Sequence, residues 1–257
     1  MHYQTISELA PRIESGEISP VDLTEAQLKR IKYLDPKLQS YATVTEDLAI
    51  EQAERAKNEI ANGLYRGKLH GIPIAVKDLY NTAGIRTMCG SAVFANNVPK
   101  HNATVVNKLN EAGSVLLGKL NMTEGAMGGY HPDFQIPENP WRATYWSGAS
   151  SSGSGSATAA GLAYGTLGSD TGGSIRHPAA VCGTVGLKPT WGRVSRYGVM
   201  DLAPSLDHVG PLTRSAKDAG IMLEAISGHD TKDSTSLPQH VTDMLSNVGK
   251  NLHGMKI

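Results

Sequence analysis

The chain has 257 residues, and its 24 lysine and arginine residues balance 24 aspartate and glutamate residues, so its formal net charge is zero. A chain of this length holds one large domain or two small ones, and a neutral balance provides no field that favours nucleic acid or an anionic membrane. Its apolar stretches are too short for a membrane span, and its first residues lack the basic flank and apolar core of a secretory signal.

The cysteines and histidines indicate neither a disulfide scaffold nor a metal site. Only Cys89 and Cys182 are present, and they form no Cys-x-x-Cys pair, which suits the reducing cytosol. The nine histidines show no His-Glu-x-x-His pattern and no clustered ligand spacing. We therefore expect a cytoplasmic protein without a metal or another cofactor.

The first predicted helix covers residues 18–34. Ser19 suits its N-cap, Pro20 its first position, and Asp22 its first turn, where the helix dipole favours negative charge. Apolar residues then recur at helical spacing, and Pro36 is expected to close the helix.

The remaining predicted elements alternate between helices and short apolar strands. We expect helices over 45–62, 103–112, 151–163 and 215–227, and buried strands over 71–76 and 114–117. This alternation favours an α/β architecture. No internal repeat or sharp change of composition indicates a second domain, so we expect one domain over 1–257, with N-terminal helices over 1–64 and a core over 65–215. The last segment, 254–257, has the pattern of a strand that is just beginning.

Residues 148–190 are dense in Gly, Ser, Thr and Ala, a composition that is common in flexible linkers. Apolar residues interrupt the run at a density that a linker has no reason to carry. Small residues let the backbone approach a ligand closely, and glycine reaches backbone angles that other residues avoid. The run therefore predicts a packed functional core rather than a linker.

The same run resembles the amidase signature family, in which a serine-rich segment precedes a Gly-Ser-Asp-Thr-Gly-Gly-Ser-Ile-Arg turn. In this chain the turn occupies residues 168–176, and the match continues through 182–195. Upstream, GIPIAVKDL at 71–79 and GKLNMTE at 118–124 fit the same family. The resemblance implies a mixed β-sheet covered by helices on both faces. Members of the family typically continue well beyond this length, so we expect a partial chain.

The resemblance also implies a Ser–Ser–Lys triad made of Lys77, Ser150 and Ser174. A serine hydroxyl is a weak nucleophile that needs a base beside it, and a lysine serves as base only when burial keeps it neutral. Lys77 directly follows the apolar run 72–76, which predicts burial, while the alternative is a lysine that reaches solvent from a strand end. Ser150 would relay the proton, with Ser151 as the alternative because three serines are adjacent. In the family, the relay serine follows a cis peptide bond.

The nucleophile candidate, Ser174, follows two glycines in a tight turn. Such a turn presents several backbone N–H groups, which are the donors that an oxyanion requires. The resemblance implies an oxyanion hole made of the N–H groups of Thr171, Gly172, Gly173 and Ser174. An ordinary turn is the alternative interpretation of this short motif.

Neighbours of the turn are further candidates. Asp170 and Arg176 flank it and are expected to pair and brace it, while the alternative is that Arg176 binds a substrate carboxylate bidentately. Met127, Gly128 and Gly129 match a family segment that lines the acyl side of the pocket, although a flexible methionine there also suits a core position.

Two further patterns are set aside. The segment GSVLLGK at 113–119 imitates a phosphate-binding loop, but Leu120 stands where Ser or Thr would bind magnesium, and the interior of the segment is strand-like. No Gly-x-Ser-x-Gly motif surrounds a candidate nucleophile, which argues against an α/β-hydrolase.

These observations predict an amidase that hydrolyses a small carboxamide through an acyl-serine. Segments 192–198, 224–228 and 233–236 also resemble the glutamine-hydrolysing component of a tRNA-dependent amidotransferase, whereas 131–141 and 145–161 are closer to free-standing amidases. A third alternative is an inactive fragment whose pocket is open to water. The expected partner is a small amide substrate, and we expect no direct binding to nucleic acid or to a membrane. A homodimer is a further alternative.

Overall fold

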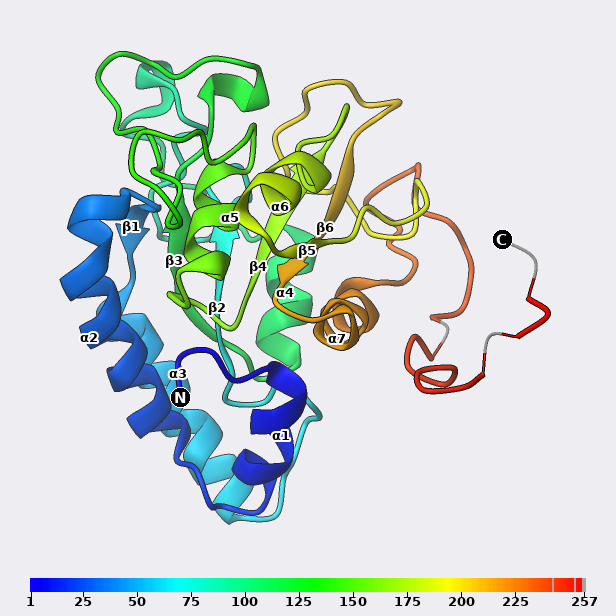
Figure 1. Ribbon diagram of the computed structural model, residues 1–257. Helices are drawn as coiled ribbons and strands as arrows, with labels where there is room; N and C mark the ends of the chain where they lie inside the picture. Colours follow the sequence, from blue (N-terminus) through cyan, green and yellow to red (C-terminus); the bar gives the residue numbers. More distant parts are fainter. Residues whose placement is uncertain (242, 252, 256–257) are drawn as a thin grey trace.

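The computed structural model describes residues 1–241, 243–251 and 253–255. Within them, a six-stranded sheet has the order β1-β3-β2-β4-β6-β5 (Figure 1). Its strands are β1 (Tyr41–Val44), β2 (Pro73–Lys77), β3 (Val115–Leu120), β4 (Gly165–Asp170), β5 (Val185–Gly186) and β6 (His208–Thr213). Strand β2 is parallel to both β3 and β4, whereas the other pairs are antiparallel. The expected mixed sheet is therefore confirmed.

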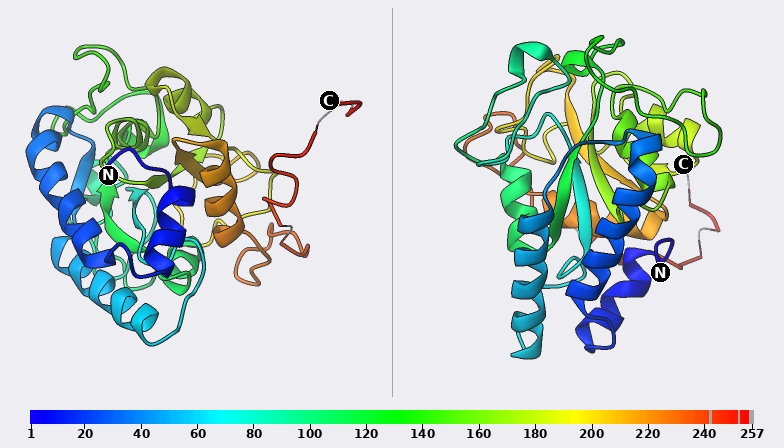
Figure 2. Two further views of the ribbon diagram at one scale, coloured as in Figure 1. Left: turned by 60° about the horizontal axis from the view of Figure 1, so that its bottom comes forward. Right: turned by 90° about the vertical axis from the view of Figure 1, so that its left-hand side faces the viewer.

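Helices cover both faces of this sheet, as expected. They are α1 (Ile6–Glu14), α2 (Pro20–Leu38), α3 (Glu46–Ala61), α4 (Thr104–Glu111), α5 (Ser152–Ala159), α6 (Arg176–Cys182) and α7 (Ala216–Ile226), with short 3₁₀ turns at Ala92–Phe94 and Glu124–Ala126. Because strand side chains alternate between faces, Ala75 packs with α2, α3 and α5, while Ile74 and Val76 pack with α1, α4 and α7. Figure 2 shows α2 and α3 running along one side of the sheet.

The start of α2 is set by local chemistry, but its end differs from the prediction. Ser19 Oγ accepts the N–H of Val21 at 3.2 Å, which caps the helix. The helix does not close at Pro36 but continues to Leu38. Proline keeps a helical φ and removes only its own N–H, so the last turn survives until Gln39 ends it in the left-handed conformation.

Other predicted elements occur near their expected bounds, with two changes of length. The strand expected over 114–117 runs on to Leu120, and the helix expected over 151–163 stops at Ala159. The sequence patterns do not predict α1, α6, β1, β4, β5 or β6. The strand expected to begin at 254–257 is absent from residues 254–255, and residues 256–257 lie outside the described part of the chain. No described helix is both long and apolar enough to cross a membrane.

A β-bulge in β3 changes which face its side chains occupy. Ile74 of β2 pairs with Leu116, but Val76 pairs with Lys119, one residue further along β3 than regular pairing would give. Since a slip of one residue moves side chains to the other face, Lys119 lies on the face of Val76. Without the bulge, Lys119 would share the face of Leu117.

Gly118 makes this bulge feasible. Its φ is +154°, and a Cβ at this position would lie 2.2 Å from the carbonyl oxygen of Thr43. The backbone of β1 therefore passes too close for any side chain, and glycine is the residue that fits.

Helix α5 also approaches backbone closely, because it is built from small residues. A Cβ at Gly153 would lie 2.4 Å from the Ser40 carbonyl oxygen and 2.6 Å from that of Asn121. We expect Gly153→Ala to lower the free energy of unfolding by about 1–3 kcal/mol, since neither backbone can move away easily. The measurement is the midpoint of urea unfolding.

A matched control for this change is Gly220→Ala in α7. There the nearest atom to a new Cβ is the end of the Leu245 side chain, at 3.0 Å. The gain in helix propensity, about 0.5–1 kcal/mol, offsets the adjustment of that side chain. Equal destabilisation by both substitutions would contradict the close approach at Gly153.

Hydrogen bonds attach helix α1 and the residues just before it to helix α7 and the residue Arg214 before that helix. Asp218 accepts the N–H groups of Ile6 and Ser7, each at 2.9 Å. Arg214 Nη2 donates to the Gln4 carbonyl oxygen at 2.9 Å. The N-terminal segment is thereby held against α7, and Figure 1 shows the two helices near the lower end of the sheet.

Candidate active site

Lys77 is the last residue of β2 and is completely buried. Its Nζ lies 2.6 Å from Ser150 Oγ and 2.9 Å from Ser169 Oγ. Burial lowers the pKa of Lys77 to about 7, although the carboxylates of Asp170 and Asp207 oppose the shift. The alternative of a lysine that reaches solvent is excluded, and a substantial fraction of this amine is neutral near pH 7.

The structure separates the roles of the two relay candidates. Ser150 contacts Lys77 directly, and the peptide bond between Ala149 and Ser150 is cis. The Ser151 hydroxyl instead donates to the Ser169 carbonyl at 3.2 Å and accepts the Ser169 N–H at 3.3 Å. Ser151 therefore fastens the serine segment to β4, while Ser150 faces the amine.

Ser174 lies beside this segment, in the turn between β4 and α6. Its carbonyl oxygen accepts the Ser151 N–H at 3.3 Å, and its side chain is partly exposed. Among the described residues, the Ser174 hydroxyl has no hydrogen-bond partner. The structure thus joins Lys77 to Ser150 by a direct contact and places Ser174 next to them, without a hydrogen bond between the two serine hydroxyls.

Asp170 organises the turn that carries Ser174. Its buried carboxylate accepts the N–H of Gly173 at 2.7 Å, of Ile175 at 3.2 Å and of Arg176 at 3.3 Å. The Arg176 guanidinium binds the same carboxylate through Nε at 3.0 Å and Nη2 at 2.9 Å. Burial would raise the pKa of Asp170, but these hydrogen bonds outweigh it and bring the pKa to about 2. Arg176 is therefore engaged in bracing the turn.

The hydrogen bonds of Asp170 determine which of the four N–H groups expected to bind an oxyanion are free to do so. That of Gly173 is occupied by Asp170. Those of Thr171, Gly172 and Ser174 have no acceptor within the described residues. A Cβ at Gly172 would meet nothing within 4 Å, so the turn is uncovered on the side to which a Gly172 side chain would point.

The segment expected to line the acyl side is on the surface. Met127 is 66% exposed, and Gly128 and Gly129 are exposed as well. Thr123 connects this segment to the site, since its hydroxyl donates to the Met127 carbonyl and its N–H donates to the Ser150 carbonyl at 3.3 Å. The alternative of a core position for Met127 is therefore wrong.

Two residues near the site were not identified from the sequence. Ser169 is the second partner of Lys77, and its position within the predicted nucleophile turn, 168–176, was the available signal. Asp207 accepts the Thr171 hydroxyl at 2.5 Å and so holds the start of the turn. No motif in the sequence marks Asp207, which lies far along the chain just before β6.

A second lysine, Lys119, is completely buried on the face of the sheet opposite to Lys77. Its Nζ is 3.2 Å from Asp78 Oδ1 and donates to the Tyr80 carbonyl at 2.8 Å and to Thr87 Oγ1 at 2.6 Å. Burial raises the pKa of Asp78, and the ammonium of Lys119 opposes that rise. The carboxylate that adjoins Lys77 in the sequence is thus paired with a different cation.

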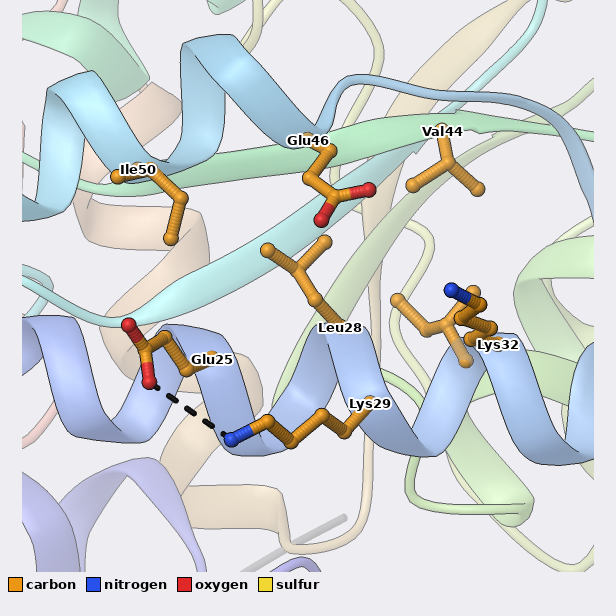
Figure 3. A pocket seen from close by; sticks show the side chains of 8 residues that line it. Glu25, Leu28, Lys29, Lys32, Val44, Glu46 and Ile50 are labelled. Atoms are coloured by element: carbon orange, nitrogen blue, oxygen red, sulfur yellow. Dashed lines mark ion pairs between the residues drawn. The ribbon is translucent and has the colours of Figure 1, made fainter.

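The space beside the catalytic candidates is small. A pocket bounded by Ser169 and Thr171 has a free volume of about 10 Å³, which is room for a single water. A larger cavity of about 730 Å³ lies far from this chemistry, between α2, α3 and β1 (Figure 3). Its lining consists of aliphatic side chains and surface charges such as the Glu25–Lys29 ion pair, at 3.8 Å. With no serine, cysteine or histidine among these lining residues, we assign the larger cavity no catalytic role.

The part of the chain that the structure describes contains no cluster of three or more His, Cys, Asp or Glu side chains that could hold a metal ion. The reactive groups that the structure does bring together are the buried lysine, the serines and the backbone donors. They are supplied by the ends of two parallel strands, β2 and β4, by the segment that leads into α5 and by the turn before α6.

Comparisons with known proteins agree with one another. A family model described as Amidase matches residues 22–257. The chain is 50% identical over 243 residues to AmiD of Mycobacterium bovis, covering 95% of this chain and 51% of that protein. It is 47% identical over 259 residues to a glutamyl-tRNA(Gln) amidotransferase component from Carboxydothermus hydrogenoformans, covering 100% of this chain and 53% of that protein.

Solved structures give the same result. The native peptide amidase from Stenotrophomonas maltophilia superposes with a TM-score of 0.86 at 38% identity, covering 93% of this chain and 52% of that one. The chain therefore spans about half the length of the relatives it matches.

Proposed function

The chain belongs to the amidase family, and from the geometry of its site we propose that it hydrolyses a small carboxamide through an acyl-serine intermediate. The observation that carries this proposal is the contact between the buried Lys77 amine and the Ser150 hydroxyl, 2.6 Å apart, beside the turn that presents Ser174. A base, a relay and a nucleophile are the parts that acyl transfer to serine requires.

In the proposed reaction, neutral Lys77 accepts the hydroxyl proton of Ser150, which takes the proton of Ser174 as Ser174 Oγ attacks the amide carbon. The C–N bond then breaks, and the proton returns through Ser150 to the departing ammonia or amine. Water, activated by the same route, hydrolyses the ester and restores Ser174. Because Lys77 alternates between neutral and charged forms, a pKa of about 7 suits it to this task at neutral pH.

The negative charge that develops on the carbonyl oxygen requires donors already in place. We assign this role to the N–H groups of Thr171, Gly172 and Ser174, because these three have no acceptor within the described chain. Gly173 contributes by holding the turn through its bond to Asp170 at 2.7 Å. Met127, Gly128 and Gly129 would form the outer wall on the acyl side, and Arg176 the brace rather than a substrate ligand.

The proposal is tested by covalent labelling and by a substrate panel. Phenylmethanesulfonyl fluoride, which reacts with activated serines, should modify Ser174 and no other serine, as read by mass spectrometry of peptides. Aliphatic, aromatic and amino-acid amides should then be screened for ammonia release. Labelling spread over surface serines, with no amide hydrolysed, would favour the inactive-fragment alternative.

A second candidate function is glutamine hydrolysis as one component of a tRNA-dependent amidotransferase. It is favoured by the 47% identity to such a component over the whole chain. The two functions differ in their requirements, since the free-standing amidase needs no partner. Ammonia release from glutamine that rises on addition of the other amidotransferase components and tRNA would replace the first candidate by the second.

A further inference from the structure

Two lysines are completely buried on neighbouring strands of this small region, and the structure gives them different partners. Lys77 is surrounded by the neutral hydroxyls of Ser150 and Ser169. Lys119 contacts the carboxylate of Asp78 at 3.2 Å. A buried amine beside a carboxylate keeps its proton, whereas one beside hydroxyls loses it more readily.

The sequence alone does not direct Asp78 away from Lys77, because the two residues are neighbours. Asp78 lies in the turn just after β2, and its carboxylate contacts Lys119 rather than Lys77. The bulge at Gly118 brings Lys119 onto the face of Val76, where it meets this carboxylate. The pairing of Asp78 with Lys119 is therefore a product of the bulge.

We propose that Lys119 is a positioning residue for the reaction at Lys77: it binds the Asp78 carboxylate on one face of the sheet and leaves Lys77, on the other face, with no carboxylate in contact. This inference rests on the proposed function, in which Lys77 is the base. It gives a role to a residue whose surrounding segment, 113–119, imitates a phosphate-binding loop.

Lys119 is fixed where this role requires it. Its Nζ donates to the Tyr80 carbonyl at 2.8 Å and to the Thr87 hydroxyl at 2.6 Å, while the second oxygen of Asp78 accepts the Met88 N–H at 2.9 Å. The contact with Asp78 Oδ1 is an ion pair at 3.2 Å, and this oxygen accepts no hydrogen bond from the described residues. The pair therefore cannot rearrange toward Lys77 without breaking several buried hydrogen bonds.

Other titratable groups face this region and are unchanged in every variant considered below. Those that face Lys77 are Asp170, Asp207 and Cys89. Those that face the Asp78–Lys119 pair are Arg86 and Cys89. Burial raises the pKa of Cys89 to about 12, so its thiol is uncharged near neutral pH.

The test is a double-mutant cycle in the whole chain, made of Lys119→Met, Asp78→Asn and the double variant. Lys119→Met leaves the Asp78 charge unbalanced, which stabilises protonated Lys77 and should raise its titration midpoint by about one pH unit. Asp78→Asn leaves the Lys119 charge unbalanced and should lower the midpoint. The double variant, with neither charge, should return close to the wild-type midpoint.

Two readouts separate this inference from the proposed function. The midpoint of Lys77 is measured directly, from the pH dependence of its ¹³Cε resonance in protein labelled at lysine. The rate at which phenylmethanesulfonyl fluoride modifies Ser174 is measured over the same pH range. If Lys77 titrates as expected but Ser174 is never modified, the proposed function fails, while the effect of Lys119 on the charge of Lys77 is still shown.

Other outcomes overturn the inference. If both single variants keep the wild-type midpoint, or if the double variant shifts as far as Lys119→Met, then Lys119 only supports the structure. Lys29→Met, a change of an exposed lysine on α2, is the control and should not move the midpoint. Should Lys119→Met fail to fold, as judged by urea unfolding, Asp78→Asn and the double variant still decide the question. Asp78→Asn should lower the titration midpoint of Lys77, and the double variant should return it close to the wild-type value.

Discussion

Replacement of Ser174 by alanine is expected to abolish amide hydrolysis and leave the fold intact. Without the hydroxyl no acyl-serine forms, and loss of a catalytic nucleophile typically costs roughly 10⁴- to 10⁶-fold in rate. Because the Ser174 hydroxyl has no hydrogen-bond partner in the described chain, its removal leaves no buried group unsatisfied. Ammonia release from the best amide of the panel and the urea midpoint are the two measurements.

Ser114→Ala is the matched control for this substitution. Ser114 is buried and precedes β3, at the end of that strand opposite to the site. Its hydroxyl donates to the Leu109 carbonyl at 2.9 Å, so its loss affects stability more than catalysis. Hydrolysis by Ser174→Ala at a rate near that of the control would show that another group is the nucleophile.

Replacement of Lys77 should have the second largest effect. Lys77→Ala is expected to lower the hydrolysis rate by about 100- to 10,000-fold, the usual cost of removing a positioned base. Lys77→Arg should be no better, because a guanidinium stays protonated and accepts no proton. In the wild-type protein the rate should rise with pH through about 7, as the amine becomes neutral, and then level off.

Stability provides a check on Lys77 that does not depend on activity. A lysine with a pKa of about 7 in the folded protein and 10.5 in the unfolded chain binds fewer protons when folded, so its contribution to the free energy of unfolding falls as the pH drops from 10.5 toward 7. Lys77→Met should lack this part of the pH dependence. An unchanged pH dependence of stability, or substantial activity in Lys77→Arg, would show that Lys77 is a charged structural residue.

Local signals in the sequence predicted a large part of this structure. Ser19 caps α2 because its hydroxyl satisfies a free backbone N–H, an interaction that depends only on neighbours along the chain. The burial of Lys77 followed from the apolar run before it. Strands β4 and β6 were missed because Gly165 and Gly168 in one, and Gly210 and Pro211 in the other, are weak strand formers whose pairing is imposed by the sheet.

The finer features of the site depend on contacts between distant segments. The choice between Ser150 and Ser151 follows from which hydroxyl meets Lys77, and adjacent serines in a sequence do not differ in this respect. The pairing of Asp78 with Lys119 depends on a one-residue bulge, which periodicity does not reveal.

The attachment of α1 to α7 has a consequence for the order in which the newly made chain folds. The carboxylate that binds the Ile6 N–H is supplied 212 residues later. Contacts of such long separation form late and leave early segments uncovered meanwhile. The hydrogen bonds that attach α1 to α7 can therefore form only after α7 has been synthesised. Every proposed catalytic residue precedes α7 in the chain, so all of them are synthesised before the contact between α1 and α7 can form.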